Sequence, residues 1–245
     1  GEYCRVTAAL HPVDPAAPDI RLQVALPTTW NQKALMFGGG GYDGTIPALD
    51  GNVPFGPNDA PRPLGRGYAT FAGDSGHQAP AGFLPTASLY GEFLANDEAL
   101  RNFAGDALKK TRDAAVFLIG RYYDRDTPRQ TYFAGGSTGG REALAVAQRW
   151  ERDFDGVVSA YPAFNAATLD LYFGHMTRQL AAPGAFPRPE RANHACRAAP
   201  AVTRWARGHT CAEGSWRSSA PSGGWLTWSP SRPSVTSTWT PPRSC

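Results

Sequence analysis

The chain has 245 residues, of which 42% are hydrophobic and 18% are charged, with a formal net charge of +3. Residues 201–245 contain five arginines and one glutamate, which gives this segment a net charge of +4 and leaves −1 for residues 1–200. Residues 1–200 contain neither a basic stripe with interleaved aromatic residues nor an apolar run long enough to cross a membrane. We therefore expect neither a nucleic-acid nor a membrane partner. These residues suffice for one domain with a sizeable core.

Short apolar segments predict the strands of one sheet. They lie at residues 20–26, 34–37, 68–72, 130–134 and 156–160. Apolar residues at helical spacing predict one helix over about residues 96–123 and another over residues 141–154. Strands that alternate with helices indicate the α/β class, with a mostly parallel sheet and helices on both faces. In such a sheet, ligands bind at the carboxyl ends of the strands.

Four consecutive glycines, at residues 38–41, follow the second predicted strand. The backbone amides of such a loop are not covered by side chains. A glycine run is also typical of a flexible loop. Its position directly after an early strand favours a binding role.

Residues 135–139 form a Gly-x-Ser-x-Gly motif with Ser137 at its centre. A predicted strand precedes the motif and a predicted helix follows it, which is the setting of a nucleophile elbow. In that setting the serine hydroxyl stands clear of the sheet, near the positive end of the helix dipole. A chance match is the alternative. Arg141 and Glu142, just after the motif, could line a pocket, lie on the helix surface or form a buried pair.

Serine hydrolases of the α/β type take one oxyanion amide from the residue after the nucleophile and another from a glycine-rich loop after an early strand. Thr138 fits the first place, and Gly39, Gly40 or Gly41 fits the second. With Ser137 as the nucleophile, the pattern predicts cleavage of a carboxylic ester through an acyl-enzyme. The four cysteines have no metal-binding spacing, so we expect no cofactor or metal in this part of the protein.

The histidines give no clear base for Ser137, although the expected chain order is serine, acid, histidine. Only His175, His194 and His209 follow the serine. His175 fits a packing or lid position better, and His209 lies in the unusual segment 201–245. His77 precedes the serine, and a structural, hydrogen-bonded role is favoured for it.

Several motifs occur in one order along residues 3–196 and together resemble the tannase and feruloyl esterase family, which includes mono(hydroxyethyl) terephthalate hydrolase-like enzymes. They are Cys4-Arg5-Val6, Leu26-Pro27, Trp30-Asn31, GGGGYDG, Arg66-Gly67-Tyr68-Ala69, Asp74-Ser75-Gly76-His77, GGSTGGRE and Asp155-Gly156-Val157-Val158. The resemblance implies an α/β-hydrolase core with an inserted lid that often binds calcium. It also implies a secreted or periplasmic protein that hydrolyses small aromatic esters of the feruloyl or galloyl type.

The chain departs from the family pattern in two places. Gly136 stands where many members have a cysteine bonded to another cysteine beside the catalytic histidine, so that disulfide cannot form. The lid, the catalytic acid and the histidine are expected downstream, but the composition changes near Cys196. Residues 201–245 hold five of the seven tryptophans, nine serines and few aliphatic residues.

We therefore expect residues 1–200 to form a partial α/β-hydrolase catalytic domain that largely lacks its lid. Residues 201–245 are expected to be an irregular tail, either read out of frame or natively disordered. The favoured hypothesis is a serine carboxylic ester hydrolase that is inactive as this fragment. A non-catalytic protein that binds aromatic ligands and a truncation product without function are the alternatives.

Overall fold

A computed structural model describes residues 2–80, 91–125 and 127–181 of the protein. The chain divides into two units, Gly1–Leu169 and Asp170–Cys245. Only residues 170–181 of the second unit are described. The predicted tail at residues 201–245 and the last part of the predicted catalytic domain lie outside the described residues.

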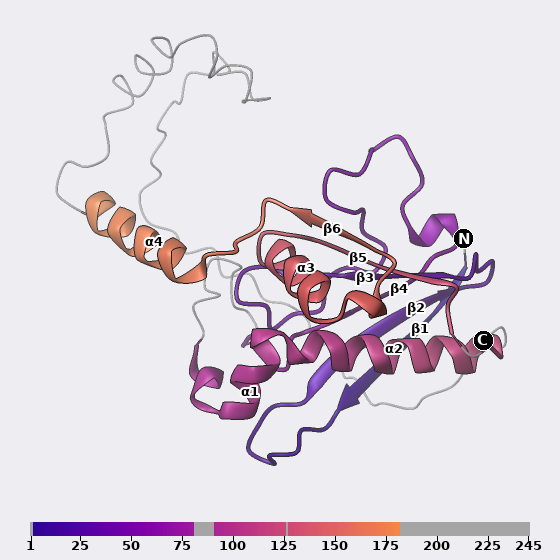
Figure 1. The fold of residues 1–245 in the computed structure, drawn as a ribbon, viewed down its shortest axis with the longest axis horizontal. Helices are drawn as coiled ribbons and strands as arrows, with labels where there is room; N and C mark the ends of the chain where they lie inside the picture. Colours follow the sequence, from indigo (N-terminus) through magenta and orange to yellow (C-terminus); the bar gives the residue numbers. More distant parts are fainter. Residues whose placement is uncertain (1, 81–90, 126, 182–245) are drawn as a thin grey trace, which may run out of the picture. The chain divides into compact units, whose positions relative to one another are not determined.

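The first unit contains a six-stranded mixed sheet with the order β1-β2-β4-β3-β5-β6 (Figure 1). The strands are β1 Tyr3–Leu10, β2 Ile20–Pro27, β3 Lys33–Phe37, β4 Ala69–Gly73, β5 Gln130–Gly136 and β6 Gly156–Ala160. Strand β2 pairs antiparallel with β1 and β4, while β4, β3, β5 and β6 pair in parallel. The five strands predicted from the sequence and the mostly parallel sheet are confirmed. The additional strand β1 is only half-buried along most of its length, so its sequence carries a weaker apolar signal.

Helical segments connect the strands. They are η1 Leu64–Arg66, η3 Glu92–Ala95, α1 Asp97–Arg101, η4 Asn102–Asp106, α2 Ala107–Tyr123, α3 Thr138–Arg149, η5 Glu151–Asp153 and α4 Ala166–Leu180. None of these described helices is long and apolar enough to cross a bilayer.

The predicted helix over residues 96–123 is interrupted. Gly105 has a φ of 135°, which breaks the helical path between α1 and α2. Only glycine adopts this conformation without strain, so the interruption is built into the sequence. The helix predicted at residues 141–154 is also shifted, because α3 begins at Thr138 and ends at Arg149. Two glycines in its first turn lower the helical propensity there, and tertiary contacts override it.

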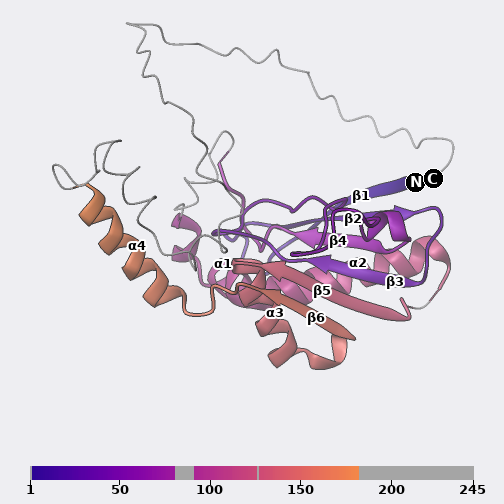
Figure 2. The same cartoon turned by 90° about the horizontal axis from the view of Figure 1, so that it is seen from above.

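Both long helices of the first unit, α2 and α3, pack on one face of the sheet (Figure 2). Leu108 and Ile119 of α2 join Val146 of α3 in one buried cluster with Phe71 and Phe133 of the strands. Within the described part of this unit, the other face carries a helix only at the short η1, so the expectation of helices on both faces is met there by η1 alone. Residues 46–68, which include η1, cover this face through the partly buried Ile46, Val53 and Leu64. A hollow of about 400 Å³ remains there beside β3, β5 and β6.

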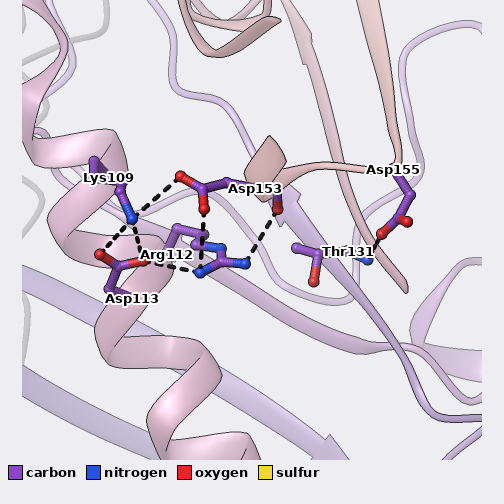
Figure 3. A network of polar contacts seen from close by, with 6 residues as sticks. All are labelled: Lys109, Arg112, Asp113, Thr131, Asp153 and Asp155. Atoms are coloured by element: carbon purple, nitrogen blue, oxygen red, sulfur yellow. Dashed lines mark hydrogen bonds and ion pairs between the residues drawn. The ribbon is translucent and has the colours of Figure 1, made fainter. Parts of the chain in front are cut away.

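Polar contacts join α2 to η5, just before β6, and tie the amino end of β5 to the residue before β6 (Figure 3). Lys109 and Arg112 of α2 each reach the side chains of Asp113 and Asp153. At the start of β5, the buried Thr131 donates its amide to the Asp155 carboxylate at 2.7 Å. The Asp155 amide donates to the Thr131 carbonyl, also at 2.7 Å. These contacts hold the end of the sheet that is opposite Ser137.

We expect Asp155→Ala to lower the free energy of unfolding by about 1–3 kcal/mol, because it leaves a buried strand amide without its charged acceptor. Asp113→Ala should cost less than about 1 kcal/mol, since its ion pairs are partly exposed. Asp155→Asn keeps an acceptor oxygen and should fall between the two. Urea unfolding followed by circular dichroism measures all three. Equal costs for the two alanine variants would contradict this ranking.

Candidate functional site

Ser137 occupies a sharp turn between β5 and α3. Its backbone has a φ of 57° and a ψ of −119°, which is strained for a residue with a side chain. Two hydrogen bonds maintain this conformation: the Ser137 amide donates to the Ala160 carbonyl at 3.2 Å, and the Ser137 carbonyl accepts from the Ala163 amide at 3.0 Å. Ser137 is exposed. The turn therefore presents the serine to solvent at the carboxyl end of β5.

The glycines of the motif allow the backbone segments to approach closely. A Cβ atom on Gly135 would lie 2.7 Å from the Gly139 Cα, and one on Gly139 would lie 2.8 Å from the Gly39 carbonyl oxygen. Both distances are shorter than ordinary van der Waals contact. Because the obstructing atoms belong to backbone, neither position can accept a side chain without moving the turn.

The glycine loop after β3 is attached to the first turn of α3. The Gly139 amide donates to the Gly39 carbonyl at 3.1 Å, and the Thr138 hydroxyl donates to the Gly41 carbonyl. These bonds bring together two motifs that are about a hundred residues apart in the sequence. Of the residues predicted for the site, Ser137 and Thr138 thus lie beside the loop that contains Gly39, Gly40 and Gly41.

The amides of the three loop glycines differ in availability. Gly39 donates its amide to Glu142 Oε2 at 2.8 Å, so this N–H already has an acceptor. Gly40 and Gly41 are exposed, and within the described residues no hydrogen bond involves their amides. The Thr138 amide belongs to the first turn of α3, where N–H groups have no intrahelical acceptor. Amides open to a ligand therefore come from both sides of the turn.

A buried acidic pair lies beneath the loop. The side chains of Asp43 and Glu142 are almost fully buried, at 6% and 4% exposure. Burial is the main cause that raises the pKa of each carboxyl group, and the proximity of Glu142 raises the pKa of Asp43 further. The Gly39 amide and the charge of Arg141 oppose the rise for Glu142. We infer that Asp43 is the neutral member and Glu142 the ionised one, because only Glu142 has a regular amide donor.

Of the choices left open for Arg141 and Glu142, Glu142 is buried, but the described residues show no ion pair between the two, and the acid beside Glu142 is Asp43. Asp43 and Ser75, the other two members of this cluster, were not predicted as site residues from the sequence. Asp43 follows directly on the four glycines, and Ser75 lies in the Asp-Ser-Gly-His motif. Their positions at strand ends were the available signal.

Tyr161 fills the space beside Gly136. A Cβ atom at Gly136 would lie 2.5 Å from the Tyr161 Cζ, so this ring occupies the place where many family members would carry a cysteine. Tyr161 also contacts Phe55 edge to face, with ring centroids 5.5 Å apart. Both rings are largely exposed. Gly136, which cannot form the disulfide found in many family members, therefore accommodates an aromatic side chain next to Ser137.

The described histidines of the first unit do not contact Ser137. His77 is buried and stacks on Phe93 with ring centroids 3.6 Å apart, and burial lowers its pKa. His11 pairs with Asp19 at the surface. His175 belongs to the second unit, whose placement relative to Ser137 is not defined, and His194 and His209 lie outside the described residues. The base for Ser137 is thus not among the described residues of the first unit.

No group of three His, Cys, Asp or Glu side chains in residues 2–80, 91–125 and 127–181 lies close enough together to hold a metal ion. The calcium that the resemblance attaches to the lid would involve the segment after Cys196, which the structure does not describe.

Known proteins resemble this chain over most of its described length. An uncharacterized esterase from Agrobacterium fabrum is 46% identical over 178 residues, covering 73% of this chain and 31% of the relative. Mono(2-hydroxyethyl) terephthalate hydrolase from Piscinibacter sakaiensis is 28% identical over 187 residues, covering 75% of this chain and 30% of the relative. The chain therefore spans about a third of the length of the curated relatives it matches.

A solved structure shows the same arrangement. Feruloyl esterase B from Aspergillus oryzae superposes with a TM-score of 0.60 at 25% identity, covering 74% of this chain and 32% of that chain. The family model described as tannase and feruloyl esterase matches residues 4–201, which include the glycine loop and the turn at Ser137. The chain thus belongs to the tannase and feruloyl esterase family.

Proposed function

We propose that the chain carries the nucleophile half of a serine carboxylic ester hydrolase. The observation behind the proposal is the strained, exposed Ser137 attached to a glycine loop whose amides are open. Ser137 Oγ would attack the ester carbonyl carbon and form an acyl-enzyme, with release of the alcohol. The amides of Thr138 and of Gly40 or Gly41 would stabilise the oxyanion. Gly39 is a weaker candidate because its amide is held by Glu142.

The proposed substrates are small aromatic esters of the feruloyl or galloyl type. Relatives named feruloyl esterase, tannase and mono(2-hydroxyethyl) terephthalate hydrolase support this class. The exposed rings of Tyr161 and Phe55 beside the elbow are compatible with an aromatic substrate. We also propose, from the resemblance to this family, that the protein acts in the periplasm or outside the cell.

We also propose that turnover by this chain alone is slow. An unactivated serine is a poor nucleophile at neutral pH, and loss of a triad member commonly costs factors of about 10⁴ to 10⁶ in rate.

A protein that binds aromatic carboxylates without cleaving esters is the second candidate, because the exposed loop amides could also bind an anion. Covalent labelling of the serine separates the two.

A fluorophosphonate ester should label Ser137 slowly in the wild-type chain and not at all in Ser137→Ala. Ser159→Ala is the matched control, because the Ser159 hydroxyl donates to the Gly140 carbonyl and has no role in the proposed reaction. Intact-mass spectrometry with peptide mapping identifies the labelled residue. Labelling of the Ser137→Ala variant at the wild-type rate would remove the nucleophile assignment.

Added imidazole should accelerate hydrolysis of methyl ferulate or methyl gallate by supplying a base to Ser137, because no histidine contacts Ser137 among the described residues of the first unit. The gain should depend on Ser137 and should disappear in Ser137→Ala. Product release is followed by chromatography over a series of imidazole concentrations. Binding of the aromatic acid with no Ser137-dependent turnover at any concentration would favour the non-catalytic candidate.

Gly139→Ala should destabilise the fold by about 1–3 kcal/mol and slow the labelling of Ser137, because the new methyl group meets the Gly39 carbonyl. Gly65→Ala is the control, since the nearest atom to its Cβ is 3.8 Å away and the site is exposed. Urea unfolding and labelling rates are compared for the two variants. A Gly139→Ala chain that folds and labels like Gly65→Ala would show that the close approach is not needed.

A further inference from the structure

Glu142 connects three segments at the carboxyl ends of the central strands. It lies on α3, one turn after Ser137. One carboxylate oxygen accepts from the Gly39 amide at 2.8 Å, and the other accepts from the Ser75 hydroxyl at 3.3 Å. The glycine loop, the turn after β4 and the helix after the nucleophile thus share one carboxylate. This carboxylate makes no contact that the proposed chemistry itself requires.

Asp43 closes the loop above Glu142. Its amide donates to the Gly40 carbonyl at 2.9 Å, and its backbone has a φ of 58°, so the chain turns tightly after the glycines. The turn places the side chain against Gly39, within 3 Å of where a Cβ atom on Gly39 would lie. Neither carboxyl oxygen of Asp43 has a regular hydrogen-bond partner among the described residues. An ionised Asp43 could donate no hydrogen bond to Glu142. A protonated Asp43 would supply one O–H donor.

Water has little access to this pair. The cavity beside Glu142 and Ser75 has a volume of about 10 Å³, which is room for one water molecule at most. Two ionised carboxylates in such a place would repel each other with little solvent screening. A single shared proton removes that repulsion.

The charged and titratable neighbours do not replace that proton. Arg141 acts on both acids electrostatically and lies on the same helix as Glu142. After β4, His77 is buried with a lowered pKa and so is neutral near pH 7. The Asp74 carboxylate is engaged by Gln78 and by the amides of Arg21 and Gly76.

We propose that Glu142 is a positioning residue for the oxyanion hole: by holding the Gly39 amide it fixes the loop so that the Gly40 and Gly41 amides face the solvent side of Ser137, and Asp43 carries the proton that lets both acids stay buried. This inference rests on the proposed hydrolase function. It assigns Glu142 no contact with substrate and no proton transfer in the reaction.

The arrangement has a defined pH dependence. A buried acid with a raised pKa binds its proton more tightly in the folded state than in the unfolded state. Its stabilising effect is complete below the ordinary pKa of an aspartate, about 3.9. The effect is lost as pH rises through the raised pKa. Above that range both acids are ionised, and the loop should loosen from α3.

The test compares Glu142→Ala, Glu142→Gln and Asp43→Asn, with Glu151→Gln as the control at an exposed position after α3. Two quantities are measured from pH 5 to pH 9: the rate of fluorophosphonate labelling at Ser137, and the hydrogen exchange of the Gly39 amide by NMR. Glu142→Ala should slow labelling about tenfold or more and expose the Gly39 amide. Glu142→Gln should restore labelling to within about threefold of wild type, because its carbonyl oxygen can still accept from Gly39.

In the wild-type chain the labelling rate should fall at alkaline pH, where the loop loosens. Asp43→Asn should reduce this fall, because the asparagine side-chain amide can donate to Glu142 at every pH. A Glu142→Ala chain that labels at the wild-type rate with a protected Gly39 amide would overturn the proposal. If Glu142→Ala does not fold, identical pH profiles for wild type, Glu142→Gln and Asp43→Asn would overturn it. A wild-type chain that is not labelled at Ser137 would refute the hydrolase function, while Gly39 exchange would still decide whether Glu142 holds the loop.

Discussion

The close packing of the glycine loop against the first turn of α3 is the contact on which the site depends. A Cβ atom on Gly38 would lie 2.7 Å from the Gly139 Cα, and one on Gly139 would lie 3.0 Å from the Gly38 carbonyl carbon. Backbone meets backbone, so no side chain can rotate away to make room. Glycine in both motifs allows Gly39 to bond with Gly139 and brings Gly41 within reach of the Thr138 hydroxyl.

Three residues of the site have strained backbone conformations at the carboxyl end of the sheet, and Gln32, with a φ of 66°, has one at the amino end of β3. Ser137, Asp43 and Ser75 all have positive φ values between 57° and 65°. Such conformations persist only where neighbouring structure determines them, and they are frequent at functional sites. The opposite end of β5 and β6 has regular pairing and the ionic contacts of α2.

The two faces of the sheet are covered in different ways. Helices α2 and α3 seal one face with a continuous apolar cluster. The other face carries a segment with little regular structure and a hollow bordered by Tyr68, Tyr132 and Val158. Val158 and Tyr161 at this side are exposed, although large apolar side chains are usually buried.

The sequence by itself determined the class of fold, the family and the sharp turn at Ser137. Alternating and apolar runs located five strands, because burial on a sheet imposes these patterns locally. The glycine and serine motifs identified the turn, because its backbone tolerates few other residues. Residues at helix ends and breaks were less well predicted. A Cβ atom on Gly105 would meet Arg149, one on Gly139 would meet the glycine loop, and one on Gly140 would meet Ala160 and Pro162, so these positions are set by residues distant in the sequence.

Only the tertiary structure decided which loop amides are open and what lies beneath them. Gly39, Gly40 and Gly41 cannot be distinguished from the sequence. In the structure the Gly39 amide donates to Glu142, because α3 places that carboxylate beside Gly39. The pairing of Asp43 with Glu142 joins residues 99 positions apart, and no local pattern encodes such a contact. Helix placement on one face was likewise set by packing. Contacts between distant segments depend on how the sheet brings strand ends together, whereas strand and turn patterns depend on neighbouring residues alone.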